Sequence, residues 1–373
     1  MKYPSAPVYK LWPLEQLFPR FHNLKKSGMW DKPFEELISD EDEPFPFSVA
    51  NHFYVMLHEK LKMMGDDEII EFCGEGQEYI LANRFLQDGQ VVKVSPSLLK
   101  KLEDTDVDLK LPAKLLRSSF PFCYLHIPEL ELEIHHYFQK KNAKVDGIYI
   151  IDRVFEPGSP DFQNATALSS ASIDQTKPLR VVDFHTVIYS MEDQQIGAFA
   201  FNLIIDDEDR PLEDVIENSL KAILRSHIQS SSHSLKNTLT IVNEFLLENM
   251  PTFMKILMYM NSSKFRYETV NEEEDLKQSL PRKVHRNKSK LKKKLSKVCN
   301  HIVIGPPSNS ESNTSENKIS SSDPKVKFHI RRGHFREQRF GKGLKDCRTI
   351  WIEPTYVGHI HAGFDNKEVI LKG

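Results

Sequence analysis

The chain has 373 residues, of which 39% are hydrophobic, and a formal net charge of −3. This length suits one large domain or two ordinary ones, and the apolar content suits a core with a sizeable solvated segment. No stretch approaches the roughly eighteen apolar residues of a membrane span, and no apolar run follows a basic start. We therefore expect a cytoplasmic protein with no membrane span, no signal peptide and no membrane partner.

Charge is distributed unevenly along the chain. Residues 1–279 hold 29 Lys and Arg against 45 Asp and Glu, a net of −16, whereas residues 280–348 hold 19 against 5, a net of +14. A basic segment on an acidic body favours an anionic partner, such as nucleic acid or the acidic face of another protein. The alternative is that the basic segment lies on its own acidic body.

The first half of the chain predicts a helical layer and the start of a sheet. Residues 1–47 are aromatic and proline-rich, which indicates a short helix and loops over a core, and Ser48 caps a predicted helix that stops at Gly65. A short strand and a helix start are predicted over 91–102. A helical turn over 112–116 then leads into a strand over 123–127.

The strongest sheet signal follows at 145–155, 179–191 and 196–206, where β-branched and aromatic residues are dense. The last two strands are joined as a hairpin. Apolar residues at helical spacing then predict helices over 211–228 and 234–260, the second kinked or split by Pro251. The predicted class is α+β, a mainly antiparallel sheet packed with helices, in a main domain spanning 1–265.

Residues 266–324 differ in composition from this main domain. Residues 280–300 contain nine Lys and Arg and no acid, with a lysine-rich run over 282–297, and a Ser- and Asn-rich stretch follows. Too little apolar surface is present to offset the entropy of ordering. We therefore expect a disordered linker here, whose lysine run is either a phosphate-binding helix or a solvated spacer.

Residues 325–373 form a basic strand-arm-strand segment that is too short to fold unaided, so we expect its strands to dock on the main domain. Arginine forks bind phosphates or carboxylates, interleaved aromatic rings can stack on unpaired bases, and glycines permit tight bends. Strand geometry would direct Phe335 to one side of the arm and His334 and Arg336 to the other. The candidate binding residues are Arg331, Arg332, His334, Phe335, Arg336, Arg339, Phe340 and Lys342.

Three other interpretations stay open for this arm. It could be a protein-interaction module that only packs on its own acidic body. It could belong to an RNA-cleaving enzyme in which His334 is the general base and Arg331 or Arg336 holds the phosphate, although no second acid or histidine is evident nearby. A metal site is a weaker interpretation, because the histidine and cysteine spacing fits no known frame. No Walker loop, GxGxxG or GxSxG motif is present. We therefore assign no catalytic residue, metal or cofactor.

The order of residues in the arm resembles a known signature, H-x-R-R-G-H-[aromatic]-R followed by G-x-G and IWIEP-x-x-VG. It consists of His329, Arg331, Arg332, Gly333, His334, Phe335 and Arg336, then Gly341 and Gly343, then Ile350, Trp351, Ile352, Pro354, Val357 and Gly358. This order is similar to the C-terminal signature of a group of uncharacterised plasmid and phage proteins that includes a type V-A anti-CRISPR protein. The stretch LPAKLLRSSFPFCYLHIP, residues 111–128, resembles the other recognisable segment of that group.

The resemblance implies a regulator carried by a mobile element. The anti-CRISPR member of the group lowers the messenger RNA of the effector nuclease through recognition of the nascent polypeptide. Many relatives have tryptophan where this chain has Phe335, and the lysine- and serine-rich insert is peculiar to this chain. We therefore predict a non-enzymatic regulator that binds RNA, ribosome or nascent polypeptide through the arm.

Overall fold

The fold is given by a computed structural model. It describes residues 7, 79, 81–82, 85–86, 89–127, 130, 132–138, 141–159, 162–163, 165–166, 173–190, 195–228, 233–281, 288–295, 298–305 and 329–357. The helix predicted over 48–65 and the Ser- and Asn-rich stretch after residue 305 lie outside the described residues. So do the segments before residue 47, apart from Pro7.

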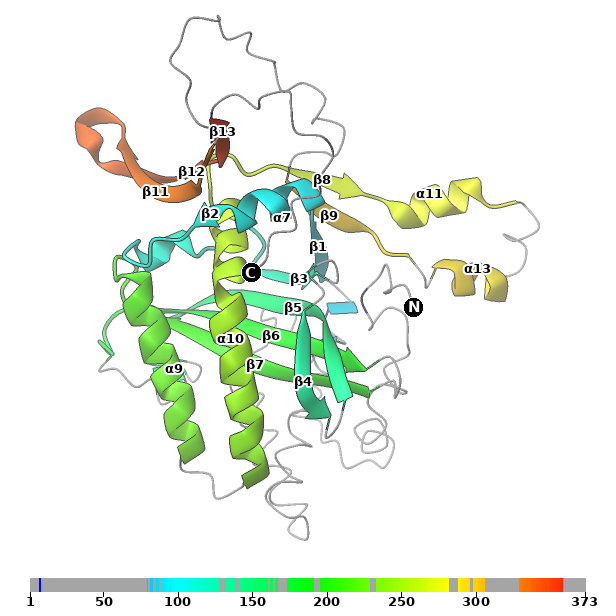
Figure 1. The fold of residues 1–373 in the computed structure, drawn as a ribbon, viewed down its shortest axis with the longest axis horizontal. Coiled ribbons are helices and arrows are strands. Elements are labelled where there is room, and N and C mark those ends of the chain that lie inside the picture. The colour runs from blue at the N-terminus through cyan, green and yellow to red at the C-terminus, as the bar shows by residue number, and fades with distance from the viewer. Residues whose placement is uncertain are drawn as a thin grey trace, which may run out of the picture.

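A mixed sheet forms the centre of the fold (Figure 1). Its strands are β1 (Gln90–Val94), β3 (Phe122–His126), β4 (Glu133–Phe138), β5 (Lys141–Phe155), β6 (Leu179–Ser190), β7 (Gln195–Ile205), β8 (Tyr267–Val270) and β9 (His301–Ile304). The strand order is β7-β6-β5-β3-β1-β9-β8, with β4 paired to β5 beside this path. Among the described strands of this sheet, the parallel pairs are β1 with β3 and β1 with β9, and the other pairs are antiparallel. The predicted α+β class with a mainly antiparallel sheet is confirmed.

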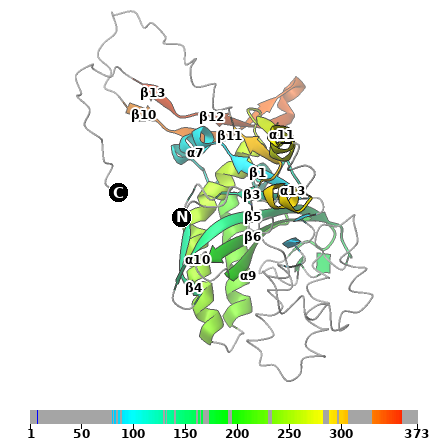
Figure 2. The same cartoon turned by 90° about the vertical axis from the view of Figure 1, so that its right-hand side faces the viewer.

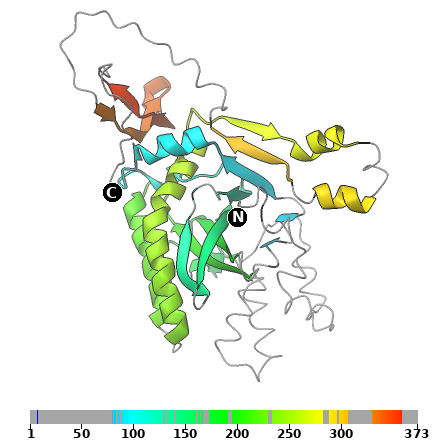
Figure 3. The same ribbon diagram turned by 45° about the vertical axis from the view of Figure 1, so that its right-hand side comes forward.

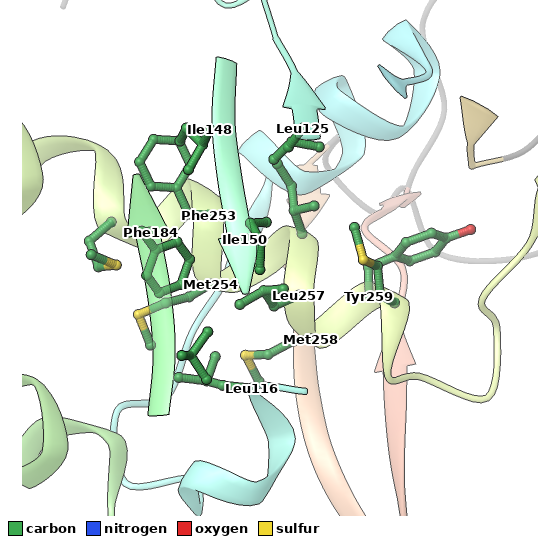
Figure 4. Close-up of a cluster of buried hydrophobic side chains, with 14 of the residues drawn as sticks. Leu116, Leu125, Ile148, Ile150, Phe184, Phe253, Met254, Leu257, Met258 and Tyr259 are labelled. Atoms are coloured by element: carbon green, nitrogen blue, oxygen red, sulfur yellow. The ribbon is translucent and has the colours of Figure 1, made fainter. Parts of the chain in front are cut away.

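Two long helices cover one face of this sheet, α9 (Leu212–Ile228) and α10 (His233–Met260) (Figures 1 and 2). Ile148, Ile150 and Phe184 of the sheet pack with Phe253 and Leu257 of α10, all at most 1% exposed (Figure 4). Apolar side chains recur at every second residue along these strands and about every 3.6 residues along α10. The sheet and the helix therefore each present one continuous apolar face to the other.

Pro251 was expected to kink or split the second long helix. The structure contains one helix from His233 to Met260, so the proline does not split it. The proline ring is on the exposed side, while Phe253, Met254 and Leu257 just after it are buried against the sheet. Packing on the apolar side therefore holds the two halves together although the proline lacks a backbone donor.

Short elements connect β1 to β3. The helix α7 (Pro96–Glu103) begins where the Ser95 hydroxyl accepts a hydrogen bond from the backbone N–H of Leu98 at 3.3 Å, with Pro96 at its first position. A two-residue strand, β2 (Thr105–Asp106), and a helical turn, η1 (Ala113–Leu115), follow. The predicted strand, helix and helical turn are all present.

The segment expected to be a disordered linker differs from that expectation over its first part. It contains β8, α11 (Glu272–Ser279), α13 (Lys288–Leu295) and β9. β9 pairs in parallel with β1, and β8 forms an antiparallel pair with β9, so both extend the main sheet. Ile302 and Ile304 are buried in the core, 7% and 0% exposed, which explains why such a short strand is ordered.

The C-terminal strands dock on the body through a second, smaller sheet. β11 (Gly333–Phe340) and β12 (Asp346–Ile352) form an antiparallel hairpin joined by η4 (Lys342–Leu344), and β11 also pairs in parallel with β2. β10 (His329–Arg331) pairs with β13 (Thr355–Val357). The pairing edge is β2, a short strand within residues 1–265 that lies outside the main sheet. The hairpin projects from one side of the fold and α11 with α13 from the other (Figures 1 and 3). None of the described helices is long and apolar enough to cross a membrane.

Candidate nucleic-acid interface

The hairpin of β11 and β12 carries most of the candidate binding residues. Its register places Phe335 opposite Trp351, Arg336 opposite Ile350 and Phe340 opposite Asp346. Phe335 is buried, while His334 and Arg336 on either side of it are exposed. The predicted alternation is therefore confirmed from His334 to Arg336, with one side of the hairpin turned to the body and the other to solvent.

Aromatic packing fixes the inner side of the hairpin to the body. Phe335 is 2% exposed and stacks on Trp351 with ring centroids 6.1 Å apart. Trp351 in turn meets Tyr259 of α10 edge-on, with centroids 5.3 Å apart. Phe335 was predicted to stack on a partner, but here its ring is enclosed by the chain's own aromatics. Its role in this structure is to anchor the hairpin.

Hydrogen bonds also join the hairpin to the body and set its orientation. The indole N–H of Trp351 donates to the Thr105 hydroxyl at 3.2 Å, and that hydroxyl donates to the Lys101 carbonyl at 2.7 Å. The backbone N–H of Ser263 donates to the Thr349 carbonyl at 3.1 Å. β12 is thus attached to β2 at one point and to the segment just after α10 at another, which fixes where the hairpin tip points.

Ion pairs engage one charged residue of the hairpin and one just before it. Glu337 pairs with Lys114 at 2.7 Å, and Lys114 also pairs with Asp209 at 2.8 Å. The hydrogen bond from Lys114 holds the pKa of the Glu337 carboxyl below its usual range. Arg332 pairs with Asp106 of β2 at 3.1 Å. Arg332 therefore contacts the chain's own acid, as the protein-interaction alternative supposed for the whole arm.

The remaining cations gather toward the tip. Arg336, Arg339 and Lys342 were predicted as binding residues, and all three are exposed. The fold adds Lys345 and Arg348, which are also exposed and which the sequence analysis did not select. Hairpin pairing brings these two back beside the predicted ones, and the spacing of cations across a turn was the signal that could have found them. Arg331 lies apart from the tip, exposed on β10.

Phe340 is an exposed aromatic residue at the end of β11. Its side chain is 40% exposed, and the guanidinium carbon of Arg348 lies 5.2 Å from the centre of its ring. Arg348 reaches the ring because diagonal neighbours across an antiparallel pair are within range of long side chains. The outer side of the hairpin therefore presents an aromatic ring and a cation in contact.

The backbone at the tip bends through the left-handed region. Gly341 and Gly343 have φ of 77° and 75°, which glycine adopts without strain. A Cβ on Gly341 would lie 2.3 Å from an Asp346 carboxylate oxygen, so the aspartate side chain would have to move as well. The glycines of the G-x-G pattern thus form the tight bend that the sequence predicted.

The described part of the lysine run is separate from this tip. It forms α13, where Lys288, Lys290 and Lys294 are exposed. The neighbouring helix α11 has four acids in its first turn, Glu272, Glu273, Glu274 and Asp275 (Figure 3). The lysine run therefore lies beside acids of its own chain, on the side of the fold away from the hairpin.

A second group of titratable side chains lies on the sheet face opposite α10. Tyr124 and Asp146 are hydrogen bonded, and His126 Nε2 lies 3.8 Å from an Asp146 oxygen, with all three side chains at most 1% exposed. Burial, with the nearby charge of Lys93 and then His301, lowers the pKa of His126 to about 3. This group is enclosed, so it cannot contact a macromolecule in this conformation. Its members come from two strands, β3 and β5, so no pattern within one segment of the sequence reveals it.

Asp183 and His185 lie two residues apart on β6, and both are buried. Asp183 accepts hydrogen bonds from Arg153 and Asn202 on the neighbouring strands. Burial lowers the pKa of His185 to about 4. Within the described residues, no group of three or more His, Cys, Asp and Glu side chains could hold a metal ion.

Comparison with known families decides the relationship. The model of the anti-CRISPR type V subtype A2 family, AcrVA2-like, matches residues 92–359. The chain belongs to this family. The matched residues include both strands of the hairpin and the flanking β10 and β13, so the hairpin is part of what this family member shares with its relatives. Among curated proteins, none matches this sequence.

A solved structure supports the same relationship at the level of the fold. The chain is similar to a protein described as "Crystal structure of AcrVA2", with a TM-score of 0.50 and 13% sequence identity. The match covers 95% of this family member and 100% of the other chain. At this identity the likeness shows a shared fold and leaves function to be argued from the site.

Proposed function

We propose that this family member is a cytoplasmic regulator carried by a plasmid or phage, which binds RNA, ribosome or nascent polypeptide through the hairpin of β11 and β12. One observation carries the proposal, the convergence of exposed cations around a tip that projects from the body (Figure 1). The cations are Arg336, Arg339, Lys342, Lys345 and Arg348.

These cations suit phosphate better than they suit the chain's own acids. The nearby carboxylate of Glu337 is already paired with Lys114, and Asp346 lies against the Gly341 bend. Arginine forks bind phosphate oxygens in a bidentate manner, and each contact releases condensed counterions from RNA. A regulator that lowers a messenger RNA, as the family resemblance implies, must reach either the message, the ribosome that reads it or the emerging chain.

The test is capture of partners from a bacterial lysate, with and without ribonuclease, using the full chain. The triple variant Arg336→Ala, Arg339→Ala and Arg348→Ala should lose partners that the wild type retains. The matched control is Lys288→Ala, Lys290→Ala and Lys294→Ala on α13, which removes the same charge from the other side of the fold. Partners that ribonuclease treatment removes from the wild type are RNA or ribosomes. Partners that remain after ribonuclease treatment are bound as polypeptides. Equal capture by the wild type and both triple variants would refute the proposal.

A second candidate function has one observation in its favour. The register between β11 and β2 pairs His334 with Asp106, and Arg332 pairs with the Asp106 carboxylate at 3.1 Å. The register places a carboxylate residue opposite His334 in the paired strands, which supports this candidate. An imidazole, a carboxylate and a guanidinium are the groups that a general-base RNA-cleaving site would use. This candidate requires turnover, which separates it from binding alone.

A further inference from the structure

The hairpin tip has two exposed apolar side chains that charge pairing does not explain. Phe340 is 40% exposed and Leu344 is 59% exposed, and both lie among the cations of the tip. Phosphate contacts need only charges, so a binding surface for a nucleic acid backbone would gain nothing from these two residues. Their chemistry is that of groups that contact the faces of bases.

Leu344 also adopts an unfavourable backbone conformation. Its φ is 54°, and it is the only residue other than glycine with positive φ among the residues the structure describes. A branched side chain in the left-handed region is strained, whereas glycine there is not. Because the Leu344 side chain is largely exposed, core packing does not account for a leucine at this position. Strain held at an exposed tip is a reason to look for a functional role.

Phe340 is oriented by its contact with Arg348. The guanidinium carbon lies 5.2 Å from the ring centre, and the Cα of Arg348 is two residues along β12 from that of Asp346, the register partner of Phe340. The contact limits the freedom of both side chains before any ligand binds, so less entropy is lost on binding. A flat ring in contact with a flat cation is the kind of surface on which an unpaired base stacks.

We propose that the hairpin tip is a stacking site for unpaired bases of single-stranded RNA. Phe340 stacks on a base, Leu344 packs against the same or the next base, and Arg339, Lys342 and Lys345 hold the flanking phosphates. The proposal rests on the proposed function and narrows it to one ligand class. Base faces are covered in a duplex, and the deep, narrow major groove of A-form RNA does not admit side chains to the bases. Single strands are therefore favoured over duplexes.

The test uses the full chain and a fluorescent single-stranded RNA of mixed sequence, with the same strand annealed to its complement, and reads fluorescence anisotropy. The wild type should bind the single strand more tightly than the duplex. Phe340→Ala should weaken single-strand binding about 5- to 150-fold, from stacking worth roughly 1–3 kcal/mol per base. Because no charge is removed, the dependence of affinity on salt should stay as in the wild type.

For Leu344→Gly, we expect stability to be kept while the affinity for single-stranded RNA falls. Glycine relieves the positive φ, so the thermal midpoint should not fall, yet single-strand binding should weaken. Arg339→Ala is the charge control, and it should reduce the salt slope by about 0.7 on single strands. If neither Phe340→Ala nor Leu344→Gly weakens binding, or if the wild type binds the duplex as tightly, the stacking site is wrong. If the wild type binds neither the single strand nor the duplex, the proposed RNA-binding function is wrong as well.

Discussion

The indole N–H of Trp351 donates to the hydroxyl of Thr105 at 3.2 Å, which links the returning strand of the hairpin to a two-residue strand almost 250 positions earlier. Both side chains are at most 2% exposed. The same hydroxyl donates to the Lys101 carbonyl, so one threonine satisfies two buried polar groups. This link and the Phe335–Trp351 stack make the hairpin a continuation of the core rather than an independent arm.

Replacing this threonine should destabilise the fold. Thr105→Val keeps the side-chain shape but leaves the Trp351 indole N–H and the Lys101 carbonyl without their partner. Leaving a buried polar group unsatisfied costs about 1–3 kcal/mol. Urea denaturation should show a loss of this size in the free energy of unfolding. The control is Thr355→Val on β13, an exposed threonine in the same segment, which should change stability by less than about 0.5 kcal/mol. Equal stability of both variants would mean that the link is not formed.

The cations of the tip should determine the salt dependence of RNA binding. Each phosphate contact contributes about 0.7 to the slope of log affinity against log salt on single strands. The Arg336, Arg339 and Arg348 triple alanine variant should therefore lower the slope by about 2. The α13 triple variant carries the same charge change and should leave the slope within error. If the α13 variant lowers the slope more than the hairpin variant does, the lysine run is the RNA-binding site.

The long strands and helices are predicted well from sequence, because a repeating pattern of apolar residues is recognisable only over many residues. β5, β6 and β7 each span more than ten residues, with dense β-branched side chains, and the two long helices have wide apolar faces. β9 has four residues, His301–Ile304, beside a charged segment, and that is too short for a pattern to stand out. Its place in the sheet depends on the burial of Ile302 and Ile304 in the core, which is a tertiary contact that local sequence does not reveal.

The candidate site was predicted in part for a similar reason. Alternation along the arm correctly separates Phe335 from His334 and Arg336, but it cannot say which side meets the body. Phe335 is therefore among the predicted binding residues, whereas in the structure its ring is buried and stacks on Trp351. Arg348 was missed because it joins the tip only through the hairpin register. Asp106 was missed because β2 has two residues.

The buried histidines should make the fold sensitive to acid. The pKa of His126 is about 3 in the folded chain, against an ordinary value near 6.5 in the unfolded chain. Between these values the unfolded chain binds more protons, so stability is full above about pH 6.5 and falls as the pH drops toward 3. One such group contributes a loss of about 1.4 kcal/mol per pH unit within this window.

His126→Leu removes this titration while keeping an apolar side chain of similar size. The free energy of unfolding, measured in urea from pH 7 to pH 5, should fall less steeply than in the wild type. His185, whose burial lowers its pKa to about 4, contributes in the same direction and still titrates in the variant. A slope identical to that of the wild type would show that His126 is protonated, or reached by water, in the folded chain.

The RNA-cleaving alternative makes a prediction that binding alone does not. If His334 is a general base beside Asp106, the purified chain should degrade RNA, and His334→Ala should lower the rate by about 10²–10⁴-fold with RNA affinity nearly unchanged. Asp106→Asn should lower the rate as well, because the carboxylate orients the imidazole. The matched control is Gln338→Ala, an outer-side residue four positions along β11 with no role in that group. Degradation that persists in His334→Ala would trace to a contaminant. Failure of the wild type to degrade RNA, with or without added divalent metal, would leave binding as the function of the hairpin.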